Sequence, residues 1–140
     1  MRGFAPTGDI KEFRGDNCDV ILWFPASGIV AASLKGHIRA KVATAIYAEI
    51  DAYAAKHSFP GICFGDFEEL TDFDWEARMA LVRWNMKHRT EAQRFHLLMR
   101  SPVVQLALRV VSIALGDLVV VHENRATFEA AYTAALAQRH

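Results

Sequence analysis

The chain has 140 residues, with sixteen acidic and sixteen basic side chains, so its formal net charge is zero. Hydrophobic residues make up 52% and charged residues 23%, which is typical of a folded globular domain and excludes a disordered segment. A neutral chain has no overall field that attracts nucleic acid or an anionic membrane surface, so we expect neither partner.

Cysteine content and hydropathy narrow the class of protein further. Cys18 and Cys63 are the only cysteines, and their spacing fits neither a metal motif nor a disulfide framework. The longest apolar stretch, residues 103–115, contains three polar or charged residues and is shorter than the ~20 residues that span a bilayer. No signal peptide is evident. We therefore expect a cytoplasmic protein with reduced cysteines, without membrane insertion, metal or cofactor.

The first half of the chain predicts a lead-in, a hairpin and a helix. Residues 1–17 mix glycine, proline and charge without a period, and we expect them to be loosely ordered. From residue 18, two strand-like runs flank a Pro-Ala-Ser-Gly turn, which predicts an antiparallel hairpin. Apolar residues then recur every three or four positions up to Lys56, which predicts a helix. A Phe-Pro-Gly break at 59–61 leads into a third, buried strand.

The second half predicts helices that alternate with strands. Asp74 is the expected N-cap of one helix and Asn124 of the last, while Ser101 and Pro102 mark a helix start between them. The predicted strands span 18–24, 29–34, 95–99 and 118–121, and a further strand begins at 62. The predicted helices span 38–56, 75–88, 102–115 and 124–136.

This order of elements, β-β-α-β-α-β-α-β-α, predicts the fold class. A hairpin followed by alternating strands and helices gives an α/β fold with a mixed, mostly parallel five-stranded sheet covered by helices. No repeat, linker or low-complexity segment interrupts the pattern. We expect one domain over residues 18–140.

The element order and the closing sequence GDLVVVHENRATFEAAYTAAL resemble the STAS family, the sulfate-transporter and anti-sigma-factor-antagonist domains. In particular, the chain resembles STAS-like domains that overlap in structure with small CRAL-TRIO-type domains. The resemblance spans residues 19–136. It implies a regulatory module that binds another protein and is not an enzyme.

The resemblance also indicates where a partner would bind. In the anti-sigma-factor antagonists of this family, the loop after the third strand carries an Asp-Ser pair whose serine is phosphorylated. Here Asp72 and Asp74 lie in the corresponding loop, and Trp75 occupies the position of the serine. The resemblance thus implies a module without the phosphorylatable serine, and Thr71 is the nearest hydroxyl.

Acidic residues and histidines offer an alternative, enzymatic interpretation. The segment 66–76 contains six carboxylates, which could hold a hard cation or act in acid–base catalysis. Bulky apolar residues are interleaved among them, which favours a solvated loop that caps a helix. His96 and His122 fall in predicted strands and could be neighbours across the sheet. A non-enzymatic protein remains the preferred interpretation.

An apolar surplus on two helices suggests a surface or a pocket. In helix 75–88 we expect the face with Trp75 and Met79 to lie in the core. The opposite face and helix 102–115 then either pack on each other and complete an ordinary core, or cover a partner or a ligand. The predicted surface, for a homodimer or another protein, consists of Leu81, Trp84, Val104, Leu108, Val111 and Leu115. The alternative is a carrier for a small apolar or lipid-like molecule, with a pocket made of Phe64, Phe67, Trp75, Met79 and Leu106.

Overall fold

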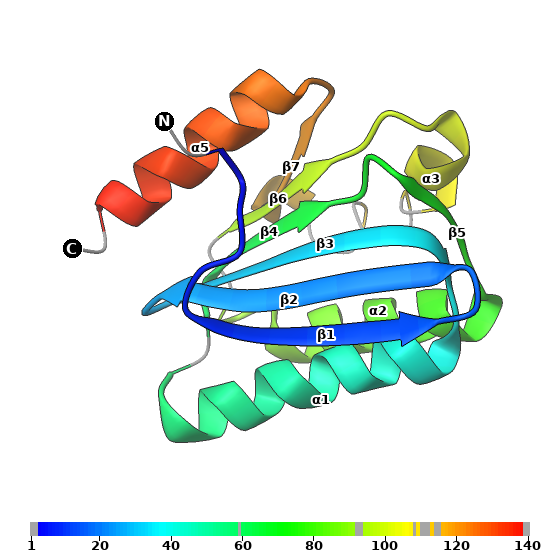
Figure 1. Ribbon diagram of the computed structural model, residues 1–140, viewed down its shortest axis with the longest axis horizontal. Coiled ribbons are helices and arrows are strands. Elements are labelled where there is room, and N and C mark those ends of the chain that lie inside the picture. Colours follow the sequence, from blue (N-terminus) through cyan, green and yellow to red (C-terminus); the bar gives the residue numbers. More distant parts are fainter. Residues whose placement is uncertain are drawn as a thin grey trace.

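The computed structural model describes residues 3–58, 60–91, 94–107, 109, 113 and 116–138. It contains seven strands, β1 (Asp9–Gly15), β2 (Cys18–Ala26), β3 (Ile29–Ile38), β4 (Ile62–Asp66), β5 (Leu70–Phe73), β6 (Arg94–Leu98) and β7 (Val119–His122). Its helices are α1 (Ala40–Lys56), α2 (Trp75–His88), α3 (Pro102–Ala107), the 3-10 turn η1 (Gly116–Leu118) and α5 (Arg125–Ala137) (Figure 1).

All seven strands form one sheet in the order β1-β2-β3-β4-β6-β7, with β5 paired to the end of β3. The pairs β1–β2 and β2–β3 are antiparallel, and the other four pairs are parallel. The predicted mixed, mostly parallel sheet is therefore confirmed. None of the helices in the described part of the chain is long and apolar enough to cross a membrane.

Two strands were not predicted. β1 lies in the segment expected to be loosely ordered, and it pairs with β2 over seven residues, with Phe13 opposite Val20. Its sequence, DIKEFRG, lacks the apolar alternation typical of a strand, because all its side chains except the half-buried Phe13 face solvent and need not be apolar. β5 lies within the acidic segment and buries only Leu70 and Phe73. Both strands form through backbone hydrogen bonds, β1 to β2 and β5 to β3. The pattern of apolar and polar side chains does not indicate this pairing.

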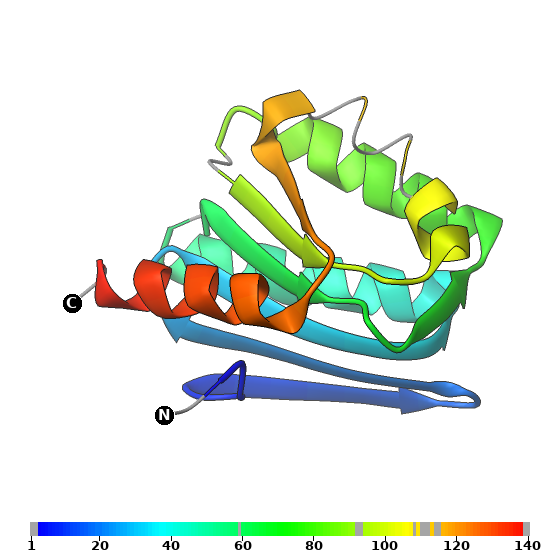
Figure 2. The same cartoon turned by 90° about the horizontal axis from the view of Figure 1, so that it is seen from above.

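Helices cover both faces of the sheet. α1 and α2 lie together on one face, and α5 lies on the other (Figures 1 and 2). The core under α1 and α2 includes Leu22, Leu34 and Ile46, all buried. Such side chains bury on one face because alternate residues of a strand point the same way.

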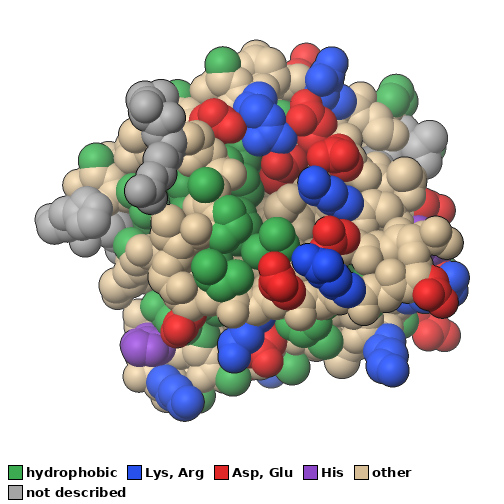
Figure 3. All heavy atoms as spheres, in the orientation of Figure 1, with side chains coloured by type: hydrophobic (Ala, Val, Ile, Leu, Met, Phe, Trp, Pro, Cys, Tyr) green, Lys and Arg blue, Asp and Glu red, His purple; other side chains and the backbone are tan. Residues whose placement is uncertain are grey.

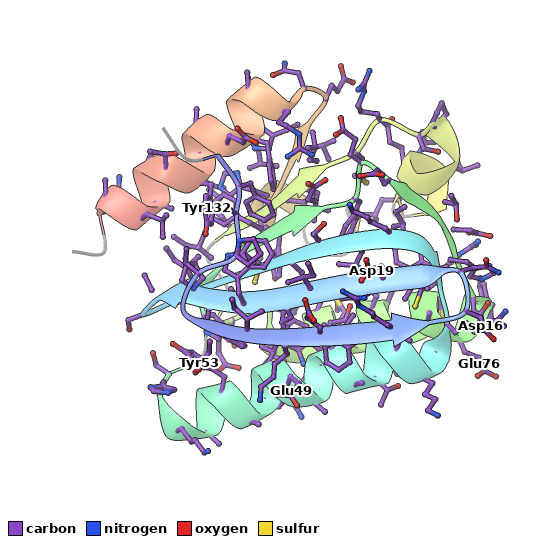
Figure 4. All side chains as sticks on the ribbon, in the orientation of Figure 1. Asp16, Asp19, Glu49, Tyr53, Glu76 and Tyr132 are labelled. Atoms are coloured by element: carbon purple, nitrogen blue, oxygen red, sulfur yellow. The ribbon has the colours of Figure 1, made fainter. Side chains whose placement is uncertain are left out.

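The core under α5 is built from aromatic rings. Phe128 and Tyr132 of α5 pack on Trp23 and Phe64 of the sheet, and the Trp23 indole N–H donates to the Tyr132 hydroxyl at 3.0 Å. Figure 4 shows Tyr132 between α5 and the sheet. Phe4 lies against this cluster, with its ring centroid 4.7 Å from that of Trp23. Aromatic packing therefore anchors the N-terminal segment, contrary to the expected loose lead-in.

The structure reverses the two faces expected for α2. Trp84 is buried, its ring stacks on Tyr47 of α1 with centroids 4.7 Å apart, and its indole N–H donates to Asp51 at 3.1 Å. Trp75, expected in the core, is 66% exposed. Contact with α1 determines which face is buried, and both faces carry a tryptophan, so the helix sequence alone left the choice open.

Candidate interaction surface and apolar cavity

The acidic segment lies where the parallel strands end and where α2 and α5 begin (Figure 1). In open α/β sheets this edge commonly carries ligand sites. Here one arginine links three acidic side chains. Arg125, at the start of α5, binds Asp66 at 2.7 Å, Glu68 at 2.9 Å and Glu129 at 3.2 Å. Hydrogen bonds from Arg125, and then from Arg100, lower the pKa of Glu68.

Asp72 and Asp74, which precede α2, are also paired. The Asp72 carboxylate accepts from the Phe73 backbone N–H at 2.8 Å and from Arg78 at 3.0 Å, and these bonds lower its pKa. Asp74 occupies the N-cap position of α2, but its side chain contacts His37 at 2.6 Å and makes no cap hydrogen bond. The expected capping role of its side chain is therefore wrong. The carboxylates of Asp72 and Asp74 therefore stabilise the end of β5 and the start of α2.

No group of three or more His, Cys, Asp or Glu side chains that could hold a metal ion occurs among the described residues. Figure 3 shows acidic and basic side chains interspersed on the face seen in Figure 1, without a continuous block of one sign. Since Asp66, Glu68, Asp72 and Asp74 have arginine or histidine partners within the chain, they do not form the cluster of free ligands that a hard cation needs.

The exposed face of α2 carries an apolar strip, which we call the α2 stripe: Trp75, Met79, Val82 and Met86. Trp75 is 66% and Met86 39% exposed, and the other two are half-buried. These positions repeat every three or four residues, so they share one side of the helix. Exposed basic and acidic side chains flank the α2 stripe on one side: Glu76, Arg83 and Lys87.

The predicted interaction surface differs from the α2 stripe. Leu81 is half-buried and Trp84 is buried against α1, so the latter cannot meet a partner without unfolding the contact. The backbone of Val104 lies in α3, but its side chain is outside what the structure describes. Leu108, Val111 and Leu115 lie outside the described residues. Of the predicted switch-loop residues, Thr71 and Asp72 lie on β5, and Thr71 is exposed. Asp74 is the N-cap residue of α2, and Trp75 is the first residue of that helix.

An apolar cavity of about 110 Å³ lies between the sheet and helices α1 and α2. Phe64 and Phe67 line it, as the sequence predicted. Trp75 and Leu106 are instead 66% and 64% exposed, and neither they nor Met79 belong to its wall. Other wall residues were not predicted. They include the polar side chains of Cys63, Tyr47 and Asn85 and the apolar side chains of Leu22, Val30, Ile46, Ile50, Phe73, Ala77 and Leu97.

The two strand histidines are neighbours, as their sequence positions suggested. His96 Nδ1 lies 3.0 Å from His122 Nε2, and His122 Nδ1 lies 3.0 Å from the hydroxyl of Thr127. That hydroxyl donates to the backbone carbonyl of Asn124 at 3.2 Å. A neutral tautomer of each ring satisfies the whole chain, in which each Nδ1–H donates. Burial, and then the neighbouring His122, lowers the pKa of His96 to about 4, and burial lowers that of His122.

This pair predicts a loss of stability in mild acid. The pKa of His96 is near 6.5 when unfolded and about 4 when folded, so the unfolded chain binds the proton first. The stability that depends on neutral His96 is fully present above pH 6.5 and is lost as the pH falls towards 4. The shift corresponds to about 3 kcal/mol at most, and with solvent screening we expect about 2 kcal/mol.

Urea unfolding at pH 7 and pH 4.5 measures this difference in the free energy of unfolding. His96→Asn should remove most of the difference, and equal pH dependence in both proteins would contradict the assignment.

Comparison with solved structures identifies the fold. An uncharacterised DUF3478-family protein with a SpoIIAA-like fold from Shewanella loihica PV-4 matches with a TM-score of 0.57 and 14% identity, over 94% of this chain and 93% of that one. The anti-sigma factor antagonist SpoIIAA in its unphosphorylated form matches with a TM-score of 0.60 and 20% identity, over 80% and 95%. An anti-sigma factor antagonist from Mycobacterium paratuberculosis matches with a TM-score of 0.57 and 14% identity, over 84% and 96%.

These likenesses confirm the STAS-like fold predicted from the sequence. No protein-family model matches the chain, and no curated protein matches its sequence. At identities of 14–20%, the solved structures show the fold alone.

Proposed function

We propose that this chain is a non-enzymatic regulatory module that binds protein through the α2 stripe, and that a second copy of the chain is one such partner. The observation that carries the proposal is the 66% exposure of Trp75 at the start of α2. Isolated exposed apolar residues are common, but a large exposed ring aligned with the exposed Met86 and the half-buried Met79 and Val82 supports an interface here. Trp75 is well suited to this, since aromatic side chains bury 150–250 Å² each.

The position of Trp75 determines what kind of regulation we propose. The resemblance places a phosphorylatable serine at this point of the fold, where a phosphate would add close to two negative charges. Trp75 has no hydroxyl to modify. We therefore propose that docking through the α2 stripe is constitutive and that the concentration of the chain controls it.

The sequence of α2 is complementary to itself in an antiparallel arrangement, which supports a second copy as the partner. When two α2 helices lie antiparallel about a two-fold axis, Trp75 of one faces Met86 of the other, and Met79 faces Val82. Sulfur–aromatic contacts of the Trp-Met kind are favourable. The same arrangement places Glu76 beside Lys87 of the second copy, so charge at the rim also matches.

Sedimentation equilibrium tests this proposal. We expect a monomer–dimer equilibrium in the micromolar range for the wild type and a monomer for Trp75→Glu, because a carboxylate would be desolvated in the interface. Ile10→Glu is the matched control, since Ile10 is an exposed apolar residue on β1. It should dimerise like the wild type. A wild-type monomer at high micromolar concentration would contradict self-association.

The apolar cavity supports a second candidate function, the carriage of a small apolar molecule. Its wall is almost entirely apolar, with Ile46 and Ile50 of α1 facing Leu22 and Val30 of the sheet. Apolar cavities in folded proteins stay dry and accept apolar guests. Native mass spectrometry of protein purified under mild conditions should then show a bound mass. The mass of the bare chain in every preparation would count against a carrier.

A further inference from the structure

The wall of the cavity under α1 and α2 limits what it can hold. It lies between the sheet and helices α1 and α2 and is partly open to the surface. Figure 2 shows these two helices on this face of the sheet. Its volume is about 110 Å³. An engineered apolar cavity of about 150 Å³ in another protein binds benzene or xenon. The space here is somewhat smaller, so a guest of about six non-hydrogen atoms is near the largest that it could enclose.

The same volume is too small to enclose a lipid. Pockets that enclose drug-sized ligands typically measure about 300–1,000 Å³, and a long acyl chain needs a comparable space. Enlarging this cavity would displace side chains such as Leu22 and Val30, both buried in the core on this face of the sheet. Packing at native density resists such displacement. The lipid-like guest allowed by the sequence is therefore too large for the cavity.

Three polar side chains line the otherwise apolar wall: Tyr47, Cys63 and Asn85. The Asn85 amide N–H donates to the Leu81 carbonyl at 2.7 Å, and the Cys63 thiol lies 3.9 Å from the Pro60 carbonyl. Burial raises the pKa of Cys63 to about 12 and that of Tyr47 above its ordinary value, so both stay protonated at neutral pH. Among the described residues, the wall thus offers neutral hydrogen-bonding groups and no charged side chain.

We propose that the cavity binds a compact, uncharged ring of about six or seven non-hydrogen atoms, of the benzene or phenol class. A phenolic hydroxyl would have Tyr47 and Asn85 available as hydrogen-bonding partners, whereas a carboxylate or ammonium would be desolvated without a counter-ion. This inference rests on the second candidate function, the carriage of a small apolar molecule, and specifies its ligand.

Methyl NMR with benzene and phenol as probes tests the proposal. We expect saturable shifts of the Ile46 and Ile50 methyl signals at millimolar probe, phenol binding more tightly than benzene, and a rise of a few degrees in Tm at saturation. The matched variant is Ala77→Leu, whose larger side chain occupies the cavity from α2. It should fold and lose at least tenfold in affinity. If Ala77→Leu does not fold, Ala43→Val reduces the cavity from α1 and takes its place.

Each outcome bears on the size limit separately from the carrier function. No saturable methyl shift with either probe, or equal shifts in the filled variant, would overturn the proposal. Tighter binding of decanol than of phenol at the same methyl groups would overturn the size limit and leave a carrier function standing. A bound mass in native spectra, with no response of the methyl signals to benzene or phenol, would likewise overturn the size limit and leave a carrier function standing.

Discussion

Replacing Phe128 with alanine is expected to destabilise the protein by about 4 kcal/mol, the middle of the range for aromatic truncation in a core. Phe128 is fully buried under α5 and meets Phe4, Phe64 and His122 through edge-on or tilted ring contacts. Removing its ring leaves a cavity that these rigid aromatic neighbours cannot close. Urea unfolding followed by tryptophan fluorescence measures the loss.

Trp75→Ala is the matched control, because it also removes a large ring. Trp75 is mostly exposed, so this change should cost less than about 1 kcal/mol in a monomer. Measurements at a concentration low enough to keep the chain monomeric avoid a contribution from the dimer. Similar losses for the two variants would mean that the faces of α2 are assigned the wrong way round.

Arg125→Met is expected to cost about 3 kcal/mol. Breaking a buried ion pair from one side costs 3–5 kcal/mol, because the remaining charge is left uncompensated. Arg125 compensates Asp66, whose side chain is only 13% exposed, and also Glu68 and Glu129, while its own side chain is 39% exposed. The partial exposure of the cluster places the expected loss at the lower end of that range. Chemical denaturation at pH 7 and low salt measures it.

Arg100→Met provides the comparison for that experiment. Arg100 binds Glu68 at 3.1 Å, but its own side chain is 66% exposed. Exposed ion pairs contribute about 0–1 kcal/mol, so we expect a loss below 1 kcal/mol. Equal losses for the two arginines would show that the partly buried Arg125 cluster does not hold α5 in place.

Much of the fold was predictable, because local signals and packing agreed. The turn at 25–28 connects β2 and β3 as an antiparallel hairpin, as expected. Asn124 caps α5, accepting from the Thr127 N–H at 2.9 Å. His96 and His122 met across the sheet because β6 and β7 are parallel neighbours that present alternate residues to the same face.

The candidate site was less predictable for a physical reason. α2 has apolar residues on two opposite sides, and only its contact with Tyr47 and Asp51 of α1 buries the Trp84 side. That contact joins residues more than thirty positions apart, so no local pattern encodes it. The cavity has the same origin, because its wall combines residues from the sheet and both helices.

The most direct test of the proposed function is an isotope-filtered NOE experiment on a mixture of labelled and unlabelled chains. We expect intermolecular NOEs from the Trp75 indole to the Met86 methyl group. Within one helix these residues are eleven positions apart, about 16 Å along the axis, so an intramolecular NOE cannot account for the signal. A dimer whose intermolecular NOEs arise from another surface, or a sample without intermolecular NOEs at millimolar concentration, would contradict docking through the α2 stripe.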